Sequence, residues 1–232
     1  MDNERKLLDD KTRRTLAERF QNDLEEEVHL ILFKGLGNED YENWSERLLK
    51  ELEELSDKIK ATVYNVLENT DLVEKYEIIS TPTILISPEK RYKIRYAGSP
   101  MGYEAWSFIE TIVAVSKGES GLGERAKEVL KEIASKGIEV KASVFVTPSC
   151  PYCPQQVLTA NKFAIEAKGL FTAECVEAQE NIELATKFNV SGVPHTVIFA
   201  REDGEWIPKR DDLVGLRPED IFAEEVLEAA VE

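Results

Sequence analysis

Apolar residues follow two different spacings along this chain, and the two spacings predict an alternation of helices and strands. Leu16, Phe20 and Leu24 share one helical face, whereas the segment 29–34, apolar from Leu30 to Phe33, is typical of a buried strand. In order, the first half is predicted to contain helix 10–26, strand 29–34, an amphipathic helix through Leu48, Leu52, Leu55 and Ile59, strand 61–67, helix 71–76, strands 83–86 and 92–97, and helix 103–115.

The second half repeats this order. Its predicted elements are helix 124–135, strand 140–146, a helix starting at Cys150, strand 171–177, helix 182–188, strand 196–199, a hairpin strand ending at Gly215, and helix 219–230. Cys150 lies 111 positions after Glu39, and Pro194 lies 112 positions after Pro82. A nearly constant offset implies a duplication. The Gly/Ser-rich stretch 116–123 is the best boundary, so we expect two units, 1–117 and 118–232.

Two cysteines lie where a predicted strand turns into a predicted helix, in the tetrapeptide Cys150-Pro151-Tyr152-Cys153. We expect Cys150 at or near the helix N-cap, where the helix dipole favours negative charge and lowers the pKa of a thiol. Cys153 should then lie one turn inside the helix, from where it can close a disulfide back to Cys150. This geometry predicts dithiol–disulfide exchange.

Other uses of the cysteines are less well supported. Half of a zinc site is one alternative for the pair, and a purely structural disulfide is another. Zinc takes four ligands, and His29 and His195 are the only histidines, so no second close ligand pair exists. Cys175, in the middle of a strand, is expected to be a small buried apolar residue, and a redox or metal role is the alternative.

The order of elements, the cysteine pair after a strand and the proline before a later strand together resemble the thioredoxin fold. Cys150-Pro151-Tyr152-Cys153 is the tetrapeptide found in glutaredoxins, and the duplicated form resembles the glutaredoxin-like protein disulfide oxidoreductases of thermophilic archaea and bacteria. The resemblance implies an α/β fold of two tandem thioredoxin-like units, with mixed β-sheets flanked by helices. It also implies a cytoplasmic thiol–disulfide oxidoreductase or isomerase.

The resemblance assigns roles to the residues around the cysteine pair and to the two prolines. Cys150 would attack a substrate disulfide and Cys153 would resolve the mixed disulfide. Pro151 and Tyr152 would shape the loop that meets substrate. The bonds before Pro82 and Pro194 would be cis, although few X–Pro bonds are, and Val193 would present its backbone to the substrate.

One departure from the family pattern lies in the first unit. Family members commonly carry a cysteine pair in each unit, but the matching tetrad here is Glu39-Asp40-Tyr41-Glu42. Tyr41 matches Tyr152, so the alignment holds while both sulfurs are absent. The first unit therefore cannot carry out thiol chemistry and is expected to be a structural or substrate-docking half.

Two further residues are candidates to assist the sulfurs. His195 follows Pro194 and either lies close to the sulfurs or is packed within its strand, and the packed position is favoured. Val144 stands where thioredoxin has a buried aspartate, so no proton acceptor for Cys153 is identified. Glu177, on the neighbouring strand, is a conceivable substitute, although a solvated strand-end glutamate is more common.

Composition narrows the class of partner. A net charge of −16 argues against nucleic acid and anionic membranes. The first residues lack a signal-peptide core and no apolar run approaches a membrane span, so the cytoplasm is the default. Abundant Glu and Lys would suit a thermophile.

Neither a cofactor nor a metal is expected. Protein thiols and disulfides are the expected substrates, with a thioredoxin-reductase-like flavoenzyme or glutathione as reductant. The alternatives are a dedicated electron donor to an enzyme such as a peroxiredoxin, and a chaperone or binding module.

Overall fold

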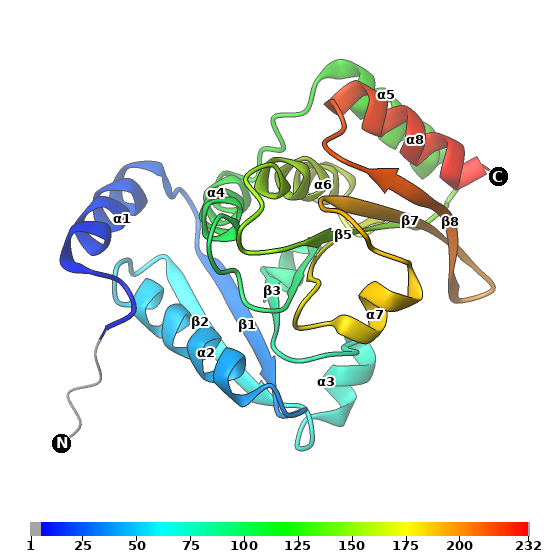
Figure 1. Cartoon of the computed structure of the whole chain (residues 1–232). Helices are drawn as coiled ribbons and strands as arrows, with labels where there is room; N and C mark the ends of the chain where they lie inside the picture. The colour runs from blue at the N-terminus through cyan, green and yellow to red at the C-terminus, as the bar shows by residue number, and fades with distance from the viewer. Residues whose placement is uncertain (1–5, 232) are drawn as a thin grey trace.

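A single mixed sheet runs through the computed structural model, which describes residues 6–231 (Figure 1). Its eight strands lie in the order β2-β1-β3-β4-β6-β5-β7-β8. The first four belong to unit one and the last four to unit two, so the sheet continues from one unit into the other. The expected mixed α/β architecture is confirmed, and one continuous sheet takes the place of a separate sheet in each unit.

The helices and strands recur in the same order in both units. Unit one contains α1 (Asp10–Asp23), β1 (Val28–Lys34), α2 (Glu39–Glu53), β2 (Ile59–Asn65), α3 (Thr70–Lys75), β3 (Thr83–Ile86), the 3₁₀ turn η1 (Pro88–Lys90), β4 (Lys93–Ala97) and α4 (Glu104–Lys117). Unit two contains α5 (Glu124–Ser135), β5 (Val140–Val146), α6 (Cys153–Ala167), β6 (Phe171–Glu177), α7 (Ile182–Lys187), β7 (His195–Glu202), β8 (Glu205–Val214) and α8 (Glu219–Val231).

Strand directions bring the important loops of both units to one edge of the sheet. β1 and β4 each pair antiparallel with β3 and are therefore parallel to each other. β4 pairs parallel with β6, and β6 with β5. The carboxyl ends of β1, β4, β5 and β6 consequently meet at the same side, which we call the carboxyl edge. β3 and β7 run the other way, so Pro82 and Pro194 also lie there.

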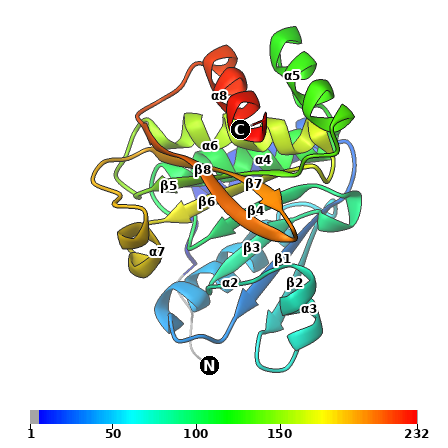
Figure 2. The same cartoon turned by 90° about the vertical axis from the view of Figure 1, so that its right-hand side faces the viewer.

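Helices cover the sheet unequally. The large core packs α1, α2, α4, α5, α6 and α8 onto one face, and Figure 2 shows α4, α5, α6 and α8 together on that side. Two smaller cores lie on the other face, one beneath α3 and one beneath α7. β5 shows the alternation that a strand requires, because Val144 and Val146 belong to the large core and Phe145 to the core beneath α7. No helix among residues 6–231 is long and apolar enough to cross a membrane.

Polar contacts join the two units beyond the β4–β6 pairing. The Glu77 carboxylate accepts hydrogen bonds from Arg201 Nη2 at 2.6 Å and Trp206 Nε1 at 2.9 Å. Asn181 Nδ2 donates to the Ala97 carbonyl at 3.0 Å. Gly98, which follows β4, has φ of +112°, and a Cβ there would stand 2.5 Å from Glu177 Cβ. A side chain at position 98 would therefore push the two units apart.

Two of the predicted elements need correction. The helix predicted through Leu55 and Ile59 ends at Glu53, and Ile59 is the first residue of β2. A turn separates the two elements, in which the Ile59 amide donates to the Ser56 carbonyl at 3.0 Å. The helical spacing of Leu55 and Ile59 is thus coincidental. The strand predicted at 196–199 is longer, His195–Glu202, because pairing with β8 extends it past the apolar run.

Candidate active site

Cys150 and Cys153 form a disulfide at the carboxyl edge, just beyond the end of β5, with their Cα atoms 5.5 Å apart. Cys150 lies near the N-cap of α6, as predicted, two residues before the N-cap residue Tyr152. The prediction that Cys153 lies one turn inside the helix is wrong, because α6 begins at Cys153. The Cys153 amide donates to Cys150 Sγ at 3.1 Å, and the next residue, Pro154, has no amide to donate. The first sulfur therefore stands in front of the helix, where it accepts a terminal N–H.

The two sulfurs differ in accessibility. Cys150 is 7% exposed, whereas Cys153 is fully buried. Tyr152 is 65% exposed, and Pro151 beside it is also exposed. A partner molecule would thus meet Pro151, Tyr152 and the edge of Cys150 before it could meet Cys153.

Val193 and Pro194 lie beside the disulfide. The Val193–Pro194 bond is cis, as is Thr81–Pro82 in unit one, so both cis bonds that the resemblance implied are present. Cys150 Sγ lies 3.7 Å from the Val193 carbonyl oxygen. The structure therefore brings the cysteine pair and the loop before β7 together.

His195 is packed within its strand, as favoured from the sequence. Its Nε2 lies 2.7 Å from the Asp211 carbonyl and donates to it, and its ring meets the edge of Phe145. Phe145 faces the core beneath α7, while Cys153 belongs to the core on the other face. His195 accordingly points away from the sulfurs.

Glu177 binds within its own loop and not to the sulfurs. Its Oε2 accepts from the Glu180 amide at 2.5 Å, and within residues 6–231 neither sulfur has a hydrogen bond to it. Burial raises the pKa of Glu177 above its usual range. No direct role as proton acceptor for Cys153 follows from these contacts.

The start of α4, in unit one, reaches the loop before Cys150 and was not identified from the sequence. The Tyr103 amide donates to the Pro148 carbonyl at 3.0 Å, and a Cβ on Gly102 would stand 2.1 Å from that same oxygen. Glu104, the next residue, is buried, and burial raises its pKa to about 7. The sequence held one indication that Glu104 is buried, because it lies one helical turn before Phe108 and therefore on the apolar face of α4.

Glu104 and Cys175 meet across the two units. Glu104 Oε2 accepts from Ser107 Oγ at 2.7 Å and lies 4.0 Å from Cys175 Sγ. Cys175 is free and buried, as predicted. Burial, reinforced by the Glu104 carboxyl, raises the pKa of Cys175 well above its usual value. Its thiol is therefore poorly suited to exchange.

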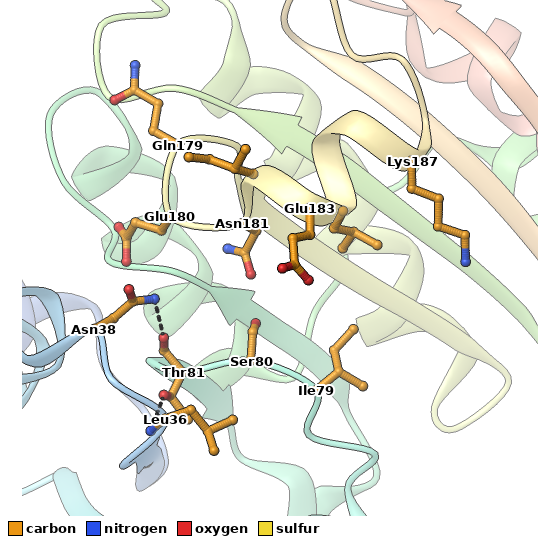
Figure 3. A pocket seen from close by; sticks show the side chains of 12 residues that line it. Leu36, Asn38, Ile79, Ser80, Thr81, Gln179, Glu180, Asn181, Glu183 and Lys187 are labelled. Carbon is orange, nitrogen blue, oxygen red and sulfur yellow. Dashed lines mark hydrogen bonds between the residues drawn. The ribbon is translucent and has the colours of Figure 1, made fainter.

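The tetrad of unit one replaces sulfur chemistry with hydrogen bonds. Glu42, the counterpart of Cys153, is buried and accepts from the Gly35 amide at 2.8 Å and Thr81 Oγ1 at 2.5 Å. Burial raises the pKa of Glu42, but the bonds from Thr81, Gly35 and Leu36 outweigh burial and leave it below its usual value. Asn38 Nδ2 donates to the Thr81 carbonyl at 2.8 Å (Figure 3). The loop before Pro82 is thus bound by the chain's own side chains.

Among residues 6–231, no three His, Cys, Asp or Glu side chains lie together as a metal ion would require.

Comparison with known proteins gives two kinds of likeness. A family model described as a thioredoxin domain matches residues 138–205, within unit two. The crystal structure of a protein disulfide oxidoreductase from Aeropyrum pernix is 30% identical, with a TM-score of 0.80 over 97% of this chain and 95% of that one. The N-terminal N/C domain of alkylhydroperoxide reductase AhpF from Enterococcus faecalis, 21% identical with a TM-score of 0.78 over 94% and 99% of the two chains, shares the fold.

Curated relatives match a smaller part of the chain. A probable thioredoxin of Archaeoglobus fulgidus is 37% identical over 59 residues, which cover 25% of this chain and 65% of that protein. The thioredoxin of Methanocaldococcus jannaschii is 28% identical over 76 residues, or 33% and 89% of the two chains. The likeness to the Aeropyrum and Enterococcus structures, by contrast, spans both units.

Proposed function

This chain belongs to the protein disulfide oxidoreductases built from two thioredoxin-like units, and from that premise we propose that it exchanges protein disulfides through Cys150 and Cys153. The observation that carries the proposal is the unequal pair at the carboxyl edge. Cys150 is 7% exposed and accepts a hydrogen bond from the first amide of α6, whereas Cys153 is fully buried.

The reaction begins with the reduced pair. The Cys150 thiolate attacks one sulfur of a substrate disulfide, and the other substrate sulfur leaves as a thiolate and takes up a proton. Cys153, as thiolate, then attacks Cys150 Sγ in the mixed disulfide and releases the second substrate thiol. Two electrons pass to the substrate, and the Cys150–Cys153 disulfide remains.

The nucleophile is assigned to Cys150 for two reasons. It is the more exposed of the two sulfurs, so a substrate disulfide can reach it. The Cys153 amide and the N-terminus of α6 place positive charge beside it, which favours the thiolate.

Substrate contacts are assigned to the residues around that sulfur. The backbone of Val193 would pair with an extended substrate segment, because its carbonyl lies beside Cys150 Sγ and Pro194 fixes the loop. Pro151 and the exposed ring of Tyr152 would form the rim over which the substrate passes.

Unit one supplies structure and not sulfur chemistry in this proposal, because Glu42 occupies the position of the resolving cysteine. The pair is recharged by an external reductant, either a thioredoxin-reductase-like flavoenzyme or glutathione, and no bound cofactor takes part. The glutaredoxin-like character, the cytoplasmic location and a thermophilic source belong to the same proposal. The likeness to the Aeropyrum pernix oxidoreductase supports it.

Reduction of insulin by dithiothreitol tests the proposal. Wild-type protein should accelerate the reduction, and Cys150→Ser should abolish the acceleration. Cys153→Ser should trap substrates as mixed disulfides at Cys150. Capture of one protein alone would favour a dedicated electron donor, and activity that survives in Cys150→Ser would refute the assignment, because no other thiol pair exists in the sequence.

A further inference from the structure

A groove at the carboxyl edge separates the loop before Pro82 in unit one from α7 in unit two (Figure 3). Its volume is about 770 Å³. Leu36, Ile79 and Thr81 line it from unit one, and Ile182, Leu184 and Lys187 line it from α7. Both units therefore contribute a wall.

Large apolar side chains are exposed in this groove. Leu36 is 55%, Ile79 65% and Ile182 66% exposed, and they approach from three different segments of the chain. Scattered apolar residues are normal on a protein surface, but a cluster around a hollow marks an interaction site. The groove therefore offers apolar contacts between polar lining residues, among them Ser80, Gln179 and Asn181.

The unit-one wall of the groove is formed by the loop before Pro82, and this loop corresponds to the loop before Pro194 that would face substrate in unit two. Thr81-Pro82 matches Val193-Pro194 at an offset of 112, and both bonds are cis. Asn38 precedes the tetrad of unit one as Ser149 precedes Cys150. Unit one has lost its sulfurs and its Thr81 carbonyl is taken by Asn38, yet the apolar wall beside that loop is open.

The groove and the disulfide are within reach of one extended peptide. The sheet order β3-β4-β6-β5 places three strand spacings between the groove at the start of β3 and Cys150 beyond the end of β5. At about 4.8 Å per spacing, the separation across the strands is roughly 14 Å, a length that about four extended residues span. A segment bound in the groove could thus continue to the sulfur.

We propose that this groove binds an extended apolar segment of the polypeptide whose disulfide is attacked at Cys150, about four residues from the reacting cysteine. The inference rests on the proposed function and names the surface that selects its substrates. Glu180 and Glu183 also line the groove, against a single lysine, Lys187, and the chain carries a net charge of −16. Acidic segments should accordingly bind worst.

Binding is measured without any redox step. The probe is a fluorescein-labelled, cysteine-free peptide of ten residues, rich in Leu and Val with one Lys, titrated against the oxidised full-length protein by fluorescence anisotropy. Ile79→Ser with Ile182→Ser should weaken binding about tenfold, since two apolar contacts with the peptide are lost. The matched control is Ile207→Ser, because Ile207 is also an exposed isoleucine but lies near the β7–β8 hairpin, at the opposite edge of the sheet. It should bind the peptide as the wild type does.

Kinetics then connect the groove with catalysis. Two substrates are compared, a disulfide-bonded apolar peptide and a small aromatic disulfide that is too short to reach the groove. The double variant should raise KM for the peptide about tenfold and leave kcat/KM for the small disulfide unchanged. Replacing the apolar residues of the peptide with Glu should have the same effect on KM in the wild-type protein.

The possible outcomes separate this inference from the proposed function. If the wild type does not reduce the small disulfide, the proposed function fails while anisotropy still reports on the groove. Equal peptide affinity in the double variant and in Ile207→Ser would overturn the groove assignment. So would a concentration-dependent dimer that the double variant abolishes, since the occupant would then be a second copy of the chain.

Discussion

Cys150 and Cys153 are only three residues apart, yet they face different surroundings. Both belong to the large core, but Cys150 is 7% exposed and accepts the first amide of α6, whereas Cys153 is fully buried. Cys175 is buried as well and lies against Glu104. At the residue scale, reactivity is therefore set by exposure and by neighbouring charge, not by the presence of a thiol.

Selective alkylation follows from this difference. In the reduced protein, iodoacetamide at pH 7 should modify Cys150 at least tenfold faster than Cys153 or Cys175, since only Cys150 combines exposure with a helix N-terminus. Mass spectrometry of timed, quenched samples measures the three rates. Modification of Cys175 at a rate like that of Cys150 would contradict its burial.

Glu104 should make stability depend on pH. Burial raises its pKa to about 7, from the 4.5 expected in the unfolded chain. Between these values the folded state holds a proton that the unfolded state releases, so the free energy of unfolding falls as pH rises from about 4.5 to 7. The loss is at most about 3 kcal/mol.

Urea denaturation between pH 4.5 and 8 measures this loss. Glu104→Gln cannot titrate and should remove part of the decline in stability. Glu68→Gln, at an exposed position in the loop before α3, is the control and should keep the decline. An identical pH profile for wild type and Glu104→Gln would show that Glu104 does not hold the proton.

At the scale of elements, the two tetrads start their helices differently. α2 begins at Glu39, the residue that matches Cys150. α6 begins three residues after Cys150, at Cys153. In unit two, Cys150 Sγ accepts the first helical amide and Pro154 offers none. In unit one, Glu42 reaches back to the amides of the preceding loop. The same duplicated plan thus ends in a redox pair in one unit and in a fixed hydrogen-bond network in the other.

Loss of the Glu42 carboxylate should destabilise unit one without affecting chemistry. Glu42→Ala leaves the Gly35 amide and Thr81 Oγ1 without their acceptor in a buried site, at a cost of about 1–3 kcal/mol in the free energy of unfolding. Urea denaturation measures this cost, and reduction of a small disulfide should keep the wild-type rate. Glu39→Gln, at the exposed first residue of α2, is the control and should change neither quantity. A large loss of activity in Glu42→Ala would mean that unit one takes part in the reaction.

Local patterns in the sequence were sufficient for most elements and for the cysteine pair. The apolar spacing predicted β3, α5, β5 and β6 closely, because each is a continuous segment with one clear period. Contacts between distant segments were not predictable in this way. The β4–β6 pairing, the approach of Gly102 to Pro148 and the Glu42 bonds all depend on how the two units meet, which no local pattern records.

At the scale of the whole molecule, the junction between the units combines a strand ladder with an ion pair. Glu77 binds Arg201 and Trp206 of the β7–β8 hairpin, while its own carbonyl accepts from Arg95 Nη1 at 3.2 Å. The Glu77 side chain and that hairpin belong to different units, so the contact fixes the hairpin against unit one.

Breaking this contact should loosen the hairpin. Glu77→Ala removes the acceptor of Trp206 Nε1, and because the site is partly exposed the loss in the free energy of unfolding should be about 1 kcal/mol. Trp206 fluorescence should shift to longer wavelength, and amide hydrogens of β8 should exchange faster. Glu68→Gln again serves as a control that should leave both signals unchanged. An unaltered exchange rate in β8 would show that the ladder alone holds the hairpin.

The β4–β6 ladder has a thermodynamic consequence. β4 and β6 are the strands of each unit that adjoin the other unit, and they are hydrogen-bonded neighbours. If either unit melts, the adjoining strand of the other unit loses its pairing partner. The two units predicted from the duplication, 1–117 and 118–232, should therefore unfold together in one cooperative transition. Scanning calorimetry should show a single heat-absorption peak whose calorimetric and van't Hoff enthalpies agree. Two resolved peaks would mean that the units melt independently despite their common sheet.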